Sequence, residues 1–333
     1  MLKKRMATIL AIVSIFITTP ALAQCVLDTV PPEGGGQPVI LSVPAFTVFV
    51  DADAPADRST PIGSWDSSHG TKVSFKCLKG DRYGKDVYPP LLGQATQQRM
   101  YATKIDGLEI MPMWYNGVAF GKFPTNSVTT EMRLDYPPAA FYRVQIFKTK
   151  SQLKLNNPQT GDVILDPGKI AYNWVNNSGI GPFPQTLMIG QIRIISTPVC
   201  RLDGKKTVNF NTVTPDDLAK GVSRPLNFSM TCATDYGHYS ATAKLTTTTP
   251  DSDNNYIKVT DSAGNDDRLK IRIDDSSGSI MHVDGTNAEI INSLNSNVPA
   301  QFKWTATILK SASTQPPKRG PFSASAEIIL EMN

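Results

Sequence analysis

Apolar and polar residues alternate along most of this chain in short runs separated by Gly, Pro, Asn and Asp. Thr, Val, Ile and Tyr are frequent in these runs, and a period of two residues is typical of a strand with one buried face. The pattern therefore predicts an all-β chain built from β-sandwich domains. The expected strands are residues 43–50, 71–77, 141–148, 187–195, 226–232, 241–247, 269–273, 302–309 and 322–332.

One short segment, residues 214–219, has the signals of a helix. Thr214 can cap its N-terminus, and Pro215 suits the first turn, where no amide hydrogen bond is lost. Asp216 and Asp217 favour the positive end of a helix dipole. We expect a single helical turn there.

The last run has the most regular alternation in the chain. In a strand, one face would carry Phe322, Ala324, Ala326, Ile328, Leu330 and Met332, and the other Ser323, Ser325, Glu327, Ile329 and Glu331. A strand of this kind needs a partner and a half-buried face. The pattern alone fits the last strand of a complete sandwich as well as the edge of an incomplete one.

The first 23 residues are typical of a secretory signal peptide. Lys3, Lys4 and Arg5 precede an apolar run that ends in small residues, so the mature chain is expected to begin at Gln24. Because the segment holds three cations and no acid, its removal lowers the formal net charge from +4 to +1. No basic stripe remains, so we expect no nucleic-acid partner.

A chain of 333 residues exceeds the size at which a single hydrophobic core stops growing. Two domains are therefore expected, residues 24–196 and 197–333, with the boundary beside Pro198. We expect each to be a β-sandwich.

Each expected domain contains two of the four cysteines, and export places them in an oxidising compartment. Four cysteines allow three pairings, of which the local one joins Cys25 to Cys77 and Cys200 to Cys232. No CxxC pair occurs and histidine is scarce, so no metal and no cofactor are expected.

Residues from about Thr197 onward resemble the pilin domain of chaperone-usher fimbriae. Pro198, Val199 and Cys200 open the domain, the second cysteine closes the run 226–232, and Gly320 and Pro321 precede the alternating end. Members of this family often carry a tyrosine near the C-terminus, whereas this chain ends with Glu331, Met332 and Asn333.

The resemblance implies an incomplete immunoglobulin-like fold that lacks its last strand. The groove left open would be filled by a strand from a periplasmic fimbrial chaperone, and later by an adjacent fimbrial subunit after passage through an outer-membrane usher. The expected groove edge consists of Phe322, Ala324, Ala326, Ile328 and Leu330.

The N-terminal domain stands where a shaft pilin of this family has a short donor extension. The resemblance therefore implies a two-domain tip adhesin, carried through the periplasm to the fimbrial tip, with an adhesin or lectin-like first domain. Aromatic rings beside amides and carboxylates suit sugar binding. The receptor-binding candidates are Trp65, Asp66, Trp114, Tyr115 and Asn116.

Three alternatives remain open at this stage. The receptor could be a host protein instead of a glycan, and the chain could be a structural or adaptor subunit of the fimbria. A secreted glycan hydrolase is the third, but no GxSxG or HExxH motif occurs and the chain has three histidines. We therefore expect binding without catalysis and no enzyme activity.

Overall fold

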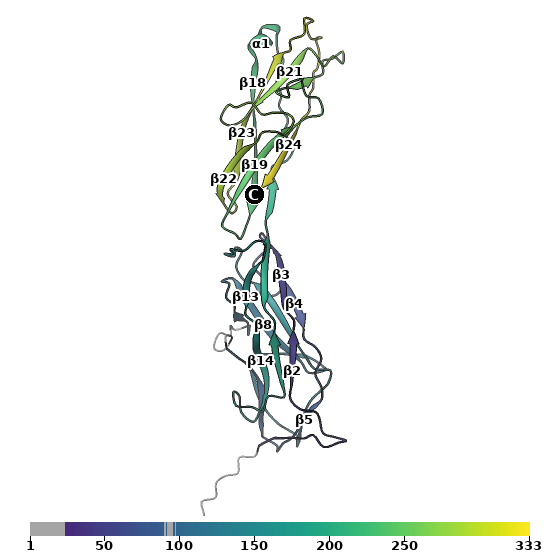
Figure 1. The fold of residues 1–333 in the computed structure, drawn as a ribbon, viewed down its shortest axis with the longest axis vertical. Helices are drawn as coiled ribbons and strands as arrows, with labels where there is room; N and C mark the ends of the chain where they lie inside the picture. The colour runs from purple at the N-terminus through teal and green to yellow at the C-terminus, as the bar shows by residue number, and fades with distance from the viewer. Residues whose placement is uncertain (1–23, 90, 92–95, 97) are drawn as a thin grey trace, which may run out of the picture.

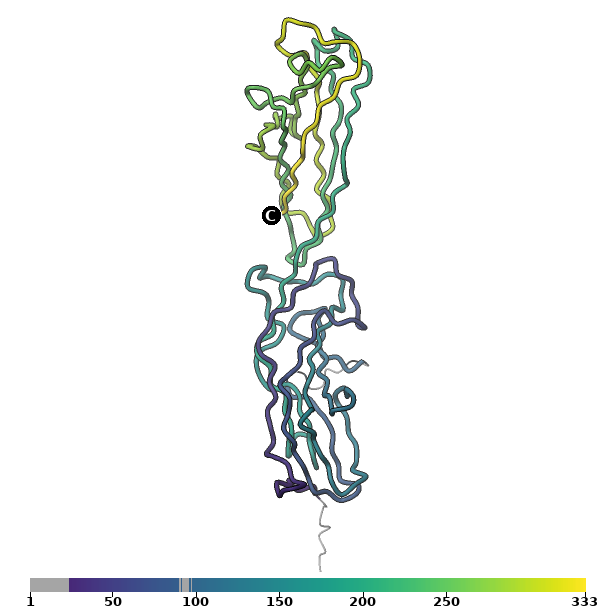
Figure 2. Tube along the Cα trace, turned by 90° about the vertical axis from the view of Figure 1, so that its right-hand side faces the viewer, coloured from purple at the N-terminus to yellow at the C-terminus, as the bar shows by residue number. Residues whose placement is uncertain are grey.

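The computed structural model describes residues 24–89, 91, 96 and 98–333. The predicted signal peptide lies outside these described residues. Two groups of strands stack end to end in an elongated molecule, and the chain passes from the first to the second group once (Figure 1, Figure 2). Among the described residues the only α-helix is α1, Pro215–Lys220, so the prediction of an all-β chain is confirmed.

The N-terminal group contains four sheets, with strand orders β1-β5-β11, β10-β6-β14-β15-β2, β4-β12-β8-β7 with β9 beside β8, and β13-β16-β3. Its core lies between the larger sheets and includes the fully buried Leu41, Ile110, Tyr142 and Ile146. The strands are β1 Val26–Leu27, β2 Val39–Val43, β3 Phe46–Asp51, β4 Gly63–Asp66, β5 Val73–Lys76, β6 Arg82–Val87, β7 Tyr101–Ala102, β8 Leu108–Tyr115, β9 Phe120–Lys122, β10 Thr125–Val128, β11 Arg133–Tyr136, β12 Phe141–Lys148, β13 Asp162–Leu165, β14 Gly168–Val175, β15 Gln185–Ile189 and β16 Ile192–Thr197.

Two of the predicted strands are each broken into two. The prediction of one strand over residues 43–50 was wrong, because Pro44 and Ala45 separate β2 from β3. The prediction over 187–195 was wrong in the same way, because the chain breaks at Gly190. The breaks face each other: β2 pairs in parallel with β15, and β3 in parallel with β16. A Cβ on Gly190 would lie 2.3 Å from the Ala45 nitrogen, so this crossing requires glycine.

Two long strands of the core, β8 and β14, were not predicted. Pro112 lies inside β8, and a proline within a run argues against a strand when only the sequence is known. In the structure β8 pairs along its whole length with β12. Tertiary packing therefore overrides the local signal.

The C-terminal group has two sheets, with orders β17-β18-β23-β21-β20 and β22-β19-β24. The aromatic rings of Phe228, Phe302 and Trp304 fill the core between them. Its strands are β17 Val199–Leu202, β18 Val222–Ala233, β19 His238–Thr246, β20 Ile257–Val259, β21 Leu269–Asp274, β22 Glu289–Asn295, β23 Ala300–Lys310 and β24 Glu327–Met332.

The single predicted helical turn is confirmed as α1. The Thr214 hydroxyl accepts from the Asp217 amide while the Asp217 carboxylate accepts from the Thr214 amide, which is a reciprocal capping box. Leu218 is the buried residue of the helix and anchors it to the core.

The last strand is shorter than the alternation predicts. Strand β24 begins at Glu327, and residues 321–326 are extended without a ladder, apart from one bridge between Thr260 and Ser323. The prediction over residues 322–326 was wrong because the partner strand β19 ends at Thr246, opposite Glu327. No further residue of β19 is left to pair with them.

Both predicted disulfides are confirmed, Cys25 to Cys77 and Cys200 to Cys232. The second joins residues that lie directly opposite each other in the β17–β18 ladder. It therefore fixes an edge strand to its sheet.

The two groups meet through a loop that follows β18. The Asp235 carboxylate, 1 % exposed, accepts from the Leu153 amide at 2.7 Å and from the Ser196 hydroxyl at 2.7 Å. The Tyr236 hydroxyl accepts from the Ser196 amide at 3.0 Å. Nearby, the buried ammonium of Lys148 donates to the carbonyl of Ala52 at 3.0 Å. The junction is thus a hydrogen-bonded contact and more than a flexible tether.

Burial lowers the pKa of Lys148, and the carboxylates of Asp235, Asp53 and Asp51 oppose that shift. Negative charge from both domains therefore faces this one ammonium.

Among the described residues, no helix has the length and apolar character needed to cross a membrane.

Candidate functional sites

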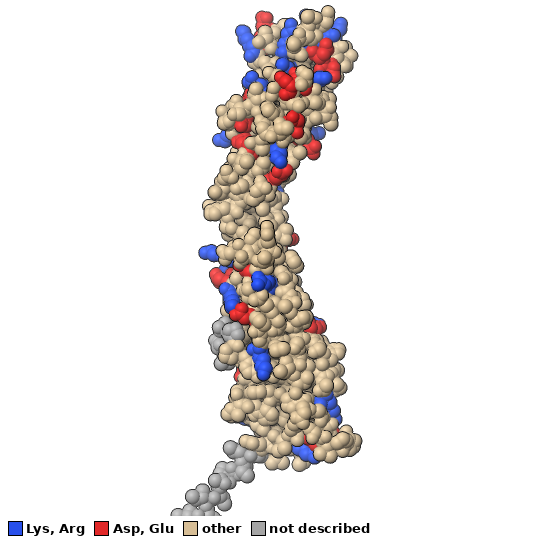
Figure 3. All heavy atoms as spheres, in the orientation of Figure 1, with Lys and Arg blue, Asp and Glu red and all other residues tan. Residues whose placement is uncertain are grey.

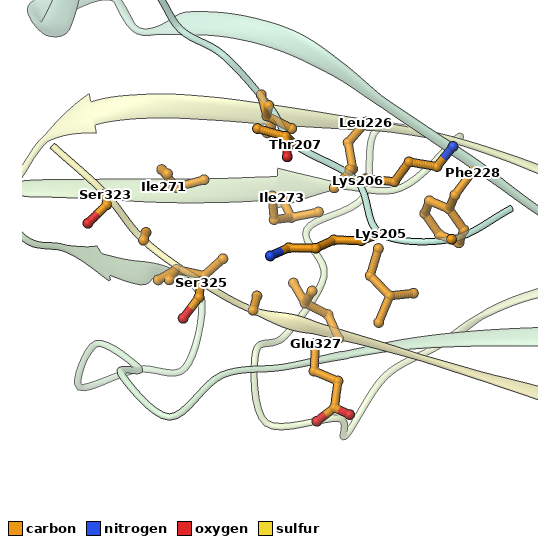
Figure 4. Close-up of a pocket in the computed structure, with 18 of the residues that line it drawn as sticks. Lys205, Lys206, Thr207, Leu226, Phe228, Ile271, Ile273, Ser323, Ser325 and Glu327 are labelled. Atoms are coloured by element: carbon orange, nitrogen blue, oxygen red, sulfur yellow. The ribbon is translucent and has the colours of Figure 1, made fainter. Parts of the chain in front are cut away.

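A groove of about 810 Å³ runs along one side of the C-terminal group. One wall is the segment that follows β17, residues 202–210, and the other is the segment 322–330 that leads into and includes most of β24. Apolar side chains from the two sheets, among them Leu226, Phe228, Leu245, Ile271 and Ile273, form the floor. Figure 4 shows Leu226, Phe228, Ile271 and Ile273 at the space between the two walls.

One wall of the groove includes a sheet edge, strand β24, and the other is the strand-free segment that follows the edge strand β17. In the described ladders, β24 pairs with β19 alone and β17 pairs with β18 alone. An extended chain laid in the groove would therefore find unused backbone donors and acceptors beside it as well as an apolar floor.

The five residues expected at the groove edge all line the groove. Phe322, Ile328 and Leu330 are half-buried and pack against the C-terminal core, whereas Ala324 and Ala326 are exposed. Because Ala324 and Ala326 have small side chains, the groove is shallower on this side at its middle. Sequence reasoning missed the opposite wall, where Val208 and Phe210 face the groove without belonging to a strand.

Charged side chains stand at the rim of the groove. Lys206 forms an ion pair with Asp203 at 2.8 Å. Lys205 extends across the groove, and the Glu327 carboxylate points away from it (Figure 4). The floor therefore has no buried charge among these residues, which suits an apolar occupant.

Residues 190–333 match the family described as fimbrial protein. The C-terminal part of this chain is therefore similar to a fimbrial domain. This match agrees with the resemblance to chaperone-usher pilin domains stated from residues 197–333. It begins at Gly190, in the break that precedes β16, the last strand of the N-terminal group.

Several solved structures are similar to this chain, each at low identity. The CsuE tip subunit of Acinetobacter baumannii, solved with the chaperone CsuC, has 13 % identity and a TM-score of 0.40 over 90 % of this chain and 100 % of that chain. The CupB6 tip adhesin of Pseudomonas aeruginosa has 9 % identity and a TM-score of 0.38 over 92 % and 95 %. The receptor binding domain of MrkD1P of Klebsiella pneumoniae has 15 % identity and a TM-score of 0.39 over 53 % and 96 %. No curated protein matches the sequence.

In the N-terminal part of this chain, Trp114 packs inward. Its ring contacts Tyr136 at a centroid distance of 5.7 Å, and its indole nitrogen donates to the Gln185 side-chain oxygen at 2.7 Å. The side chain also lies against two of the hydrophobic clusters. Trp114 therefore stabilises the fold, and its predicted role as a receptor contact has no support from this geometry.

Trp65 and Asp66 are neighbours in β4 with different environments. The Trp65 ring stacks on Phe46 at a centroid distance of 3.6 Å and packs against the core. Asp66 is exposed, and its two carboxylate oxygens accept from Arg143 at 2.6 and 2.8 Å. Asp66 remains a candidate receptor contact, while Trp65 serves packing.

Tyr115 and Asn116 stand where β8 turns into β9. The Asn116 side chain accepts from the amides of Val118 and Ala119, so it holds the turn. Tyr115 lies on the opposite face of the strand from Trp114, because consecutive residues of a strand alternate. The structure thus separates Tyr115 and Asp66 from the other three candidates.

Three residues that the sequence did not single out lie beside Tyr115 and Asp66: Phe120, Phe141 and Arg143. Tyr115 is the direct cross-strand partner of both Phe141 and Phe120. The alternation in β12 places Phe141 and Arg143 on the face opposite the buried Tyr142, and this was a readable signal. The pairing that brings Phe120 beside them was not.

The described residues contain one cluster with the spacing of metal ligands, namely Cys25, Cys77 and Asp81. The two cysteines are bonded to each other as a disulfide, so their sulfurs are not available as thiolates. This cluster carries no metal proposal.

Proposed function

We propose that this chain is a fimbrial tip adhesin. Residues 24–196 would form the receptor-binding domain, and residues 197–333 would form the fimbrial domain that joins the subunit to the pilus. Assembly would use donor-strand complementation, with a glycan as the receptor. We propose binding without catalysis, in agreement with the fimbrial family of the C-terminal domain.

The observation that carries the assembly proposal is the groove between the segment after β17 and β24. Its floor is apolar, one wall includes the open edge of β24, and the other is the segment that follows the edge strand β17. A strand with alternating apolar side chains could form backbone hydrogen bonds with the walls and pack its apolar side chains on the floor. The partners would be a periplasmic fimbrial chaperone, an outer-membrane usher and the adjacent fimbrial subunit.

This part of the proposal is tested by strand capture. The mature chain is mixed with a peptide from the N-terminal extension of a pilin of the same fimbria, and capture is followed by native electrophoresis and thermal melting. Ile328→Asp should abolish capture, because it puts a charge into the apolar groove. Ile329→Asp, on the outer face of the same strand and 37 % exposed, is the matched control and should capture the peptide normally. Equal capture by both variants would contradict the proposal.

The place in the fimbria is tested separately. Fimbriae assembled with this chain are labelled with antibodies against residues 24–196 and viewed by electron microscopy. Label at the ends of fibres supports the tip role, whereas label spaced along the shaft would replace it by a structural or adaptor role. The N-terminal domain stands beyond one end of the fimbrial domain, which leaves it accessible to such antibodies (Figure 1).

A further inference from the structure

We infer that the glycan site of the adhesin is an aromatic row on the N-terminal domain, away from the domain junction, formed by Phe141, Tyr115 and Phe120 with Arg143 and Asp66 beside it. This inference rests on the proposed adhesin function and names its binding residues. The three rings come from adjacent strands β12, β8 and β9 and stand directly opposite one another in the ladder. Their centroids lie 5.0 to 5.6 Å apart.

The row lies on the face of the sheet opposite the main core. Tyr142 and Trp114, the sequence neighbours of Phe141 and Tyr115, point to the core side, so the row faces the other way. Farther along the same face Met111, Met113 and Phe147 form a small buried cluster, whereas Phe141 and Tyr115 are half-buried and Phe120 is 38 % exposed. The exposed end of this face thus presents the Phe120 ring with two partly accessible rings beside it, which suits recognition of a ligand.

The row lies far from the fimbrial domain. Lys148, at the other end of β12, reaches Asp51 and Ala52 beside the domain junction. An eight-residue strand such as β12 spans about 25 Å, and Phe141 is its first residue. The row is therefore well removed from the domain junction, while β5 lies at the far end of the N-terminal group (Figure 1).

Arg143 is held in one orientation next to the rings. Two of its nitrogens donate to Asp66 at 2.6 and 2.8 Å, and its guanidinium carbon lies 4.5 Å from the centre of the Phe120 ring. Within the described part of the chain, the remaining terminal nitrogen of Arg143 donates to no acceptor. The ring of His69 lies 5.3 Å from that of Phe141 and adds a second polar group.

This combination favours a sugar ring over a purely apolar partner. An apolar surface pressed onto the row would strip water from the Arg143–Asp66 pair without replacing its hydrogen bonds, which is unfavourable. A hexose can stack its C–H face on Phe120 or Tyr115 while its hydroxyls accept from Arg143 and donate to Asp66. On the face drawn in Figure 3, charged side chains are sparse over the lower part of the N-terminal domain.

The test uses the full mature chain with a bound donor peptide. Immobilised glycans of varied terminal sugars identify the bound glycan, and its affinity is measured by calorimetry. Phe120→Ala removes a stacking face and Arg143→Gln removes the oriented donor, and each should weaken binding by about tenfold or more. Phe49→Ala is the matched control, because Phe49 is 67 % exposed on β3 outside the row. It should bind like the wild type.

Two outcomes would overturn the inference: binding of a glycan that survives both substitutions in the row, or capture of a protein receptor with no glycan bound. In either case the tip role would stand, because strand capture and labelling at fibre ends are measured independently. If strand capture and labelling at fibre ends both failed, the proposed tip function itself would be contradicted. Melting curves of each variant separate loss of binding from loss of fold.

Discussion

The carboxylate of Asp235 accepts a hydrogen bond from the Ser196 hydroxyl at 2.7 Å, although the two residues belong to different groups of sheets. The other oxygen of the same carboxylate accepts from the Leu153 amide at 2.7 Å. Asp235 therefore ties the β18–β19 loop both to the last strand of the N-terminal part and to an extended segment ahead of β13. One buried carboxylate thus makes two of the hydrogen bonds that join the two groups of sheets.

Asp235→Ala should loosen this junction. The change leaves the Leu153 amide and the Ser196 hydroxyl without acceptors in a buried place, at a cost of about 3 kcal/mol. The amide of Leu153 should exchange its hydrogen for deuterium markedly faster than in the wild type, as measured by mass spectrometry. Asp266→Asn, an exposed change in the C-terminal domain, is the control. Unchanged protection of residues 152–155 in Asp235→Ala would show that the loop is held by other contacts.

A second prediction concerns pH and Lys85. Burial, together with the nearby charge of Arg99, lowers the pKa of Lys85 to about 8. In the unfolded chain the lysine keeps its proton up to the ordinary pKa of 10.5. Between pH 8 and 10.5 the unfolded state therefore binds more protons than the folded state, and the free energy of unfolding rises with pH. The destabilisation caused by burying the charged lysine thus becomes smaller as pH rises. Lys85→Met should therefore raise the melting temperature over the wild type at about pH 7, and this advantage should shrink at about pH 9.5.

The contribution of Lys85 has an opposing part. Its ammonium lies 5.7 Å from the centre of the Trp114 ring and 5.6 Å from that of Phe123, and these contacts favour the charged form. Lys79→Met, at an exposed position, serves as the reference for the general effect of removing a cation. A melting-temperature difference that does not change with pH would contradict the predicted shift.

A third prediction separates packing from recognition at two adjacent residues. Trp114→Ala should destabilise the N-terminal domain by about 3 kcal/mol, since it leaves a cavity and takes the indole donor from Gln185. Tyr115→Ala should cost about 1 kcal/mol or less, because its ring lies on the outer face. Urea unfolding of the full chain measures both. Equal destabilisation by the two changes would place Tyr115 in the core and weaken its assignment to the aromatic row.

A fourth prediction concerns the disulfide of the groove wall. Replacing both Cys200 and Cys232 by Ala should destabilise the C-terminal domain by about 3 kcal/mol. It should also weaken strand capture, because the wall that follows β17 loses its covalent tie to β18. The double Ala variant of Cys25 and Cys77 should capture the peptide normally. Normal capture without the Cys200–Cys232 bridge would mean that the wall is held by packing alone.

The sequence predicted those parts of the fold that depend on local order. The strand alternation, the capped turn at Thr214 and the local cysteine pairs needed no knowledge of distant partners, and the structure contains all three. The breaks at Pro44 and Gly190 were misread because each interrupts a run that is apolar on both sides. Their common cause becomes visible only when β2 and β3 are seen beside β15 and β16.

The receptor candidates show a different limit of sequence reasoning. Alternation indicates that Trp114 and Tyr115 face opposite sides, but it does not say which side is the core. That choice depends on Gln185, which is 71 residues away and accepts from the Trp114 indole. The aromatic row likewise depends on the register between β8 and β9, which no pattern in either strand specifies.

The broken pair of parallel strands also sets how the molecule would carry tension. Strand β16 leads directly into the fimbrial domain, and along its whole length, Ile192–Thr197, it pairs with β3. A pull on the fibre would thus enter the N-terminal domain along the axis of β16 and shear its ladders with β3 and β13. In shear the hydrogen bonds of a ladder share the load, whereas in peeling they break one at a time. A subunit fixed at its outer end would therefore resist drag as a mechanically strong link.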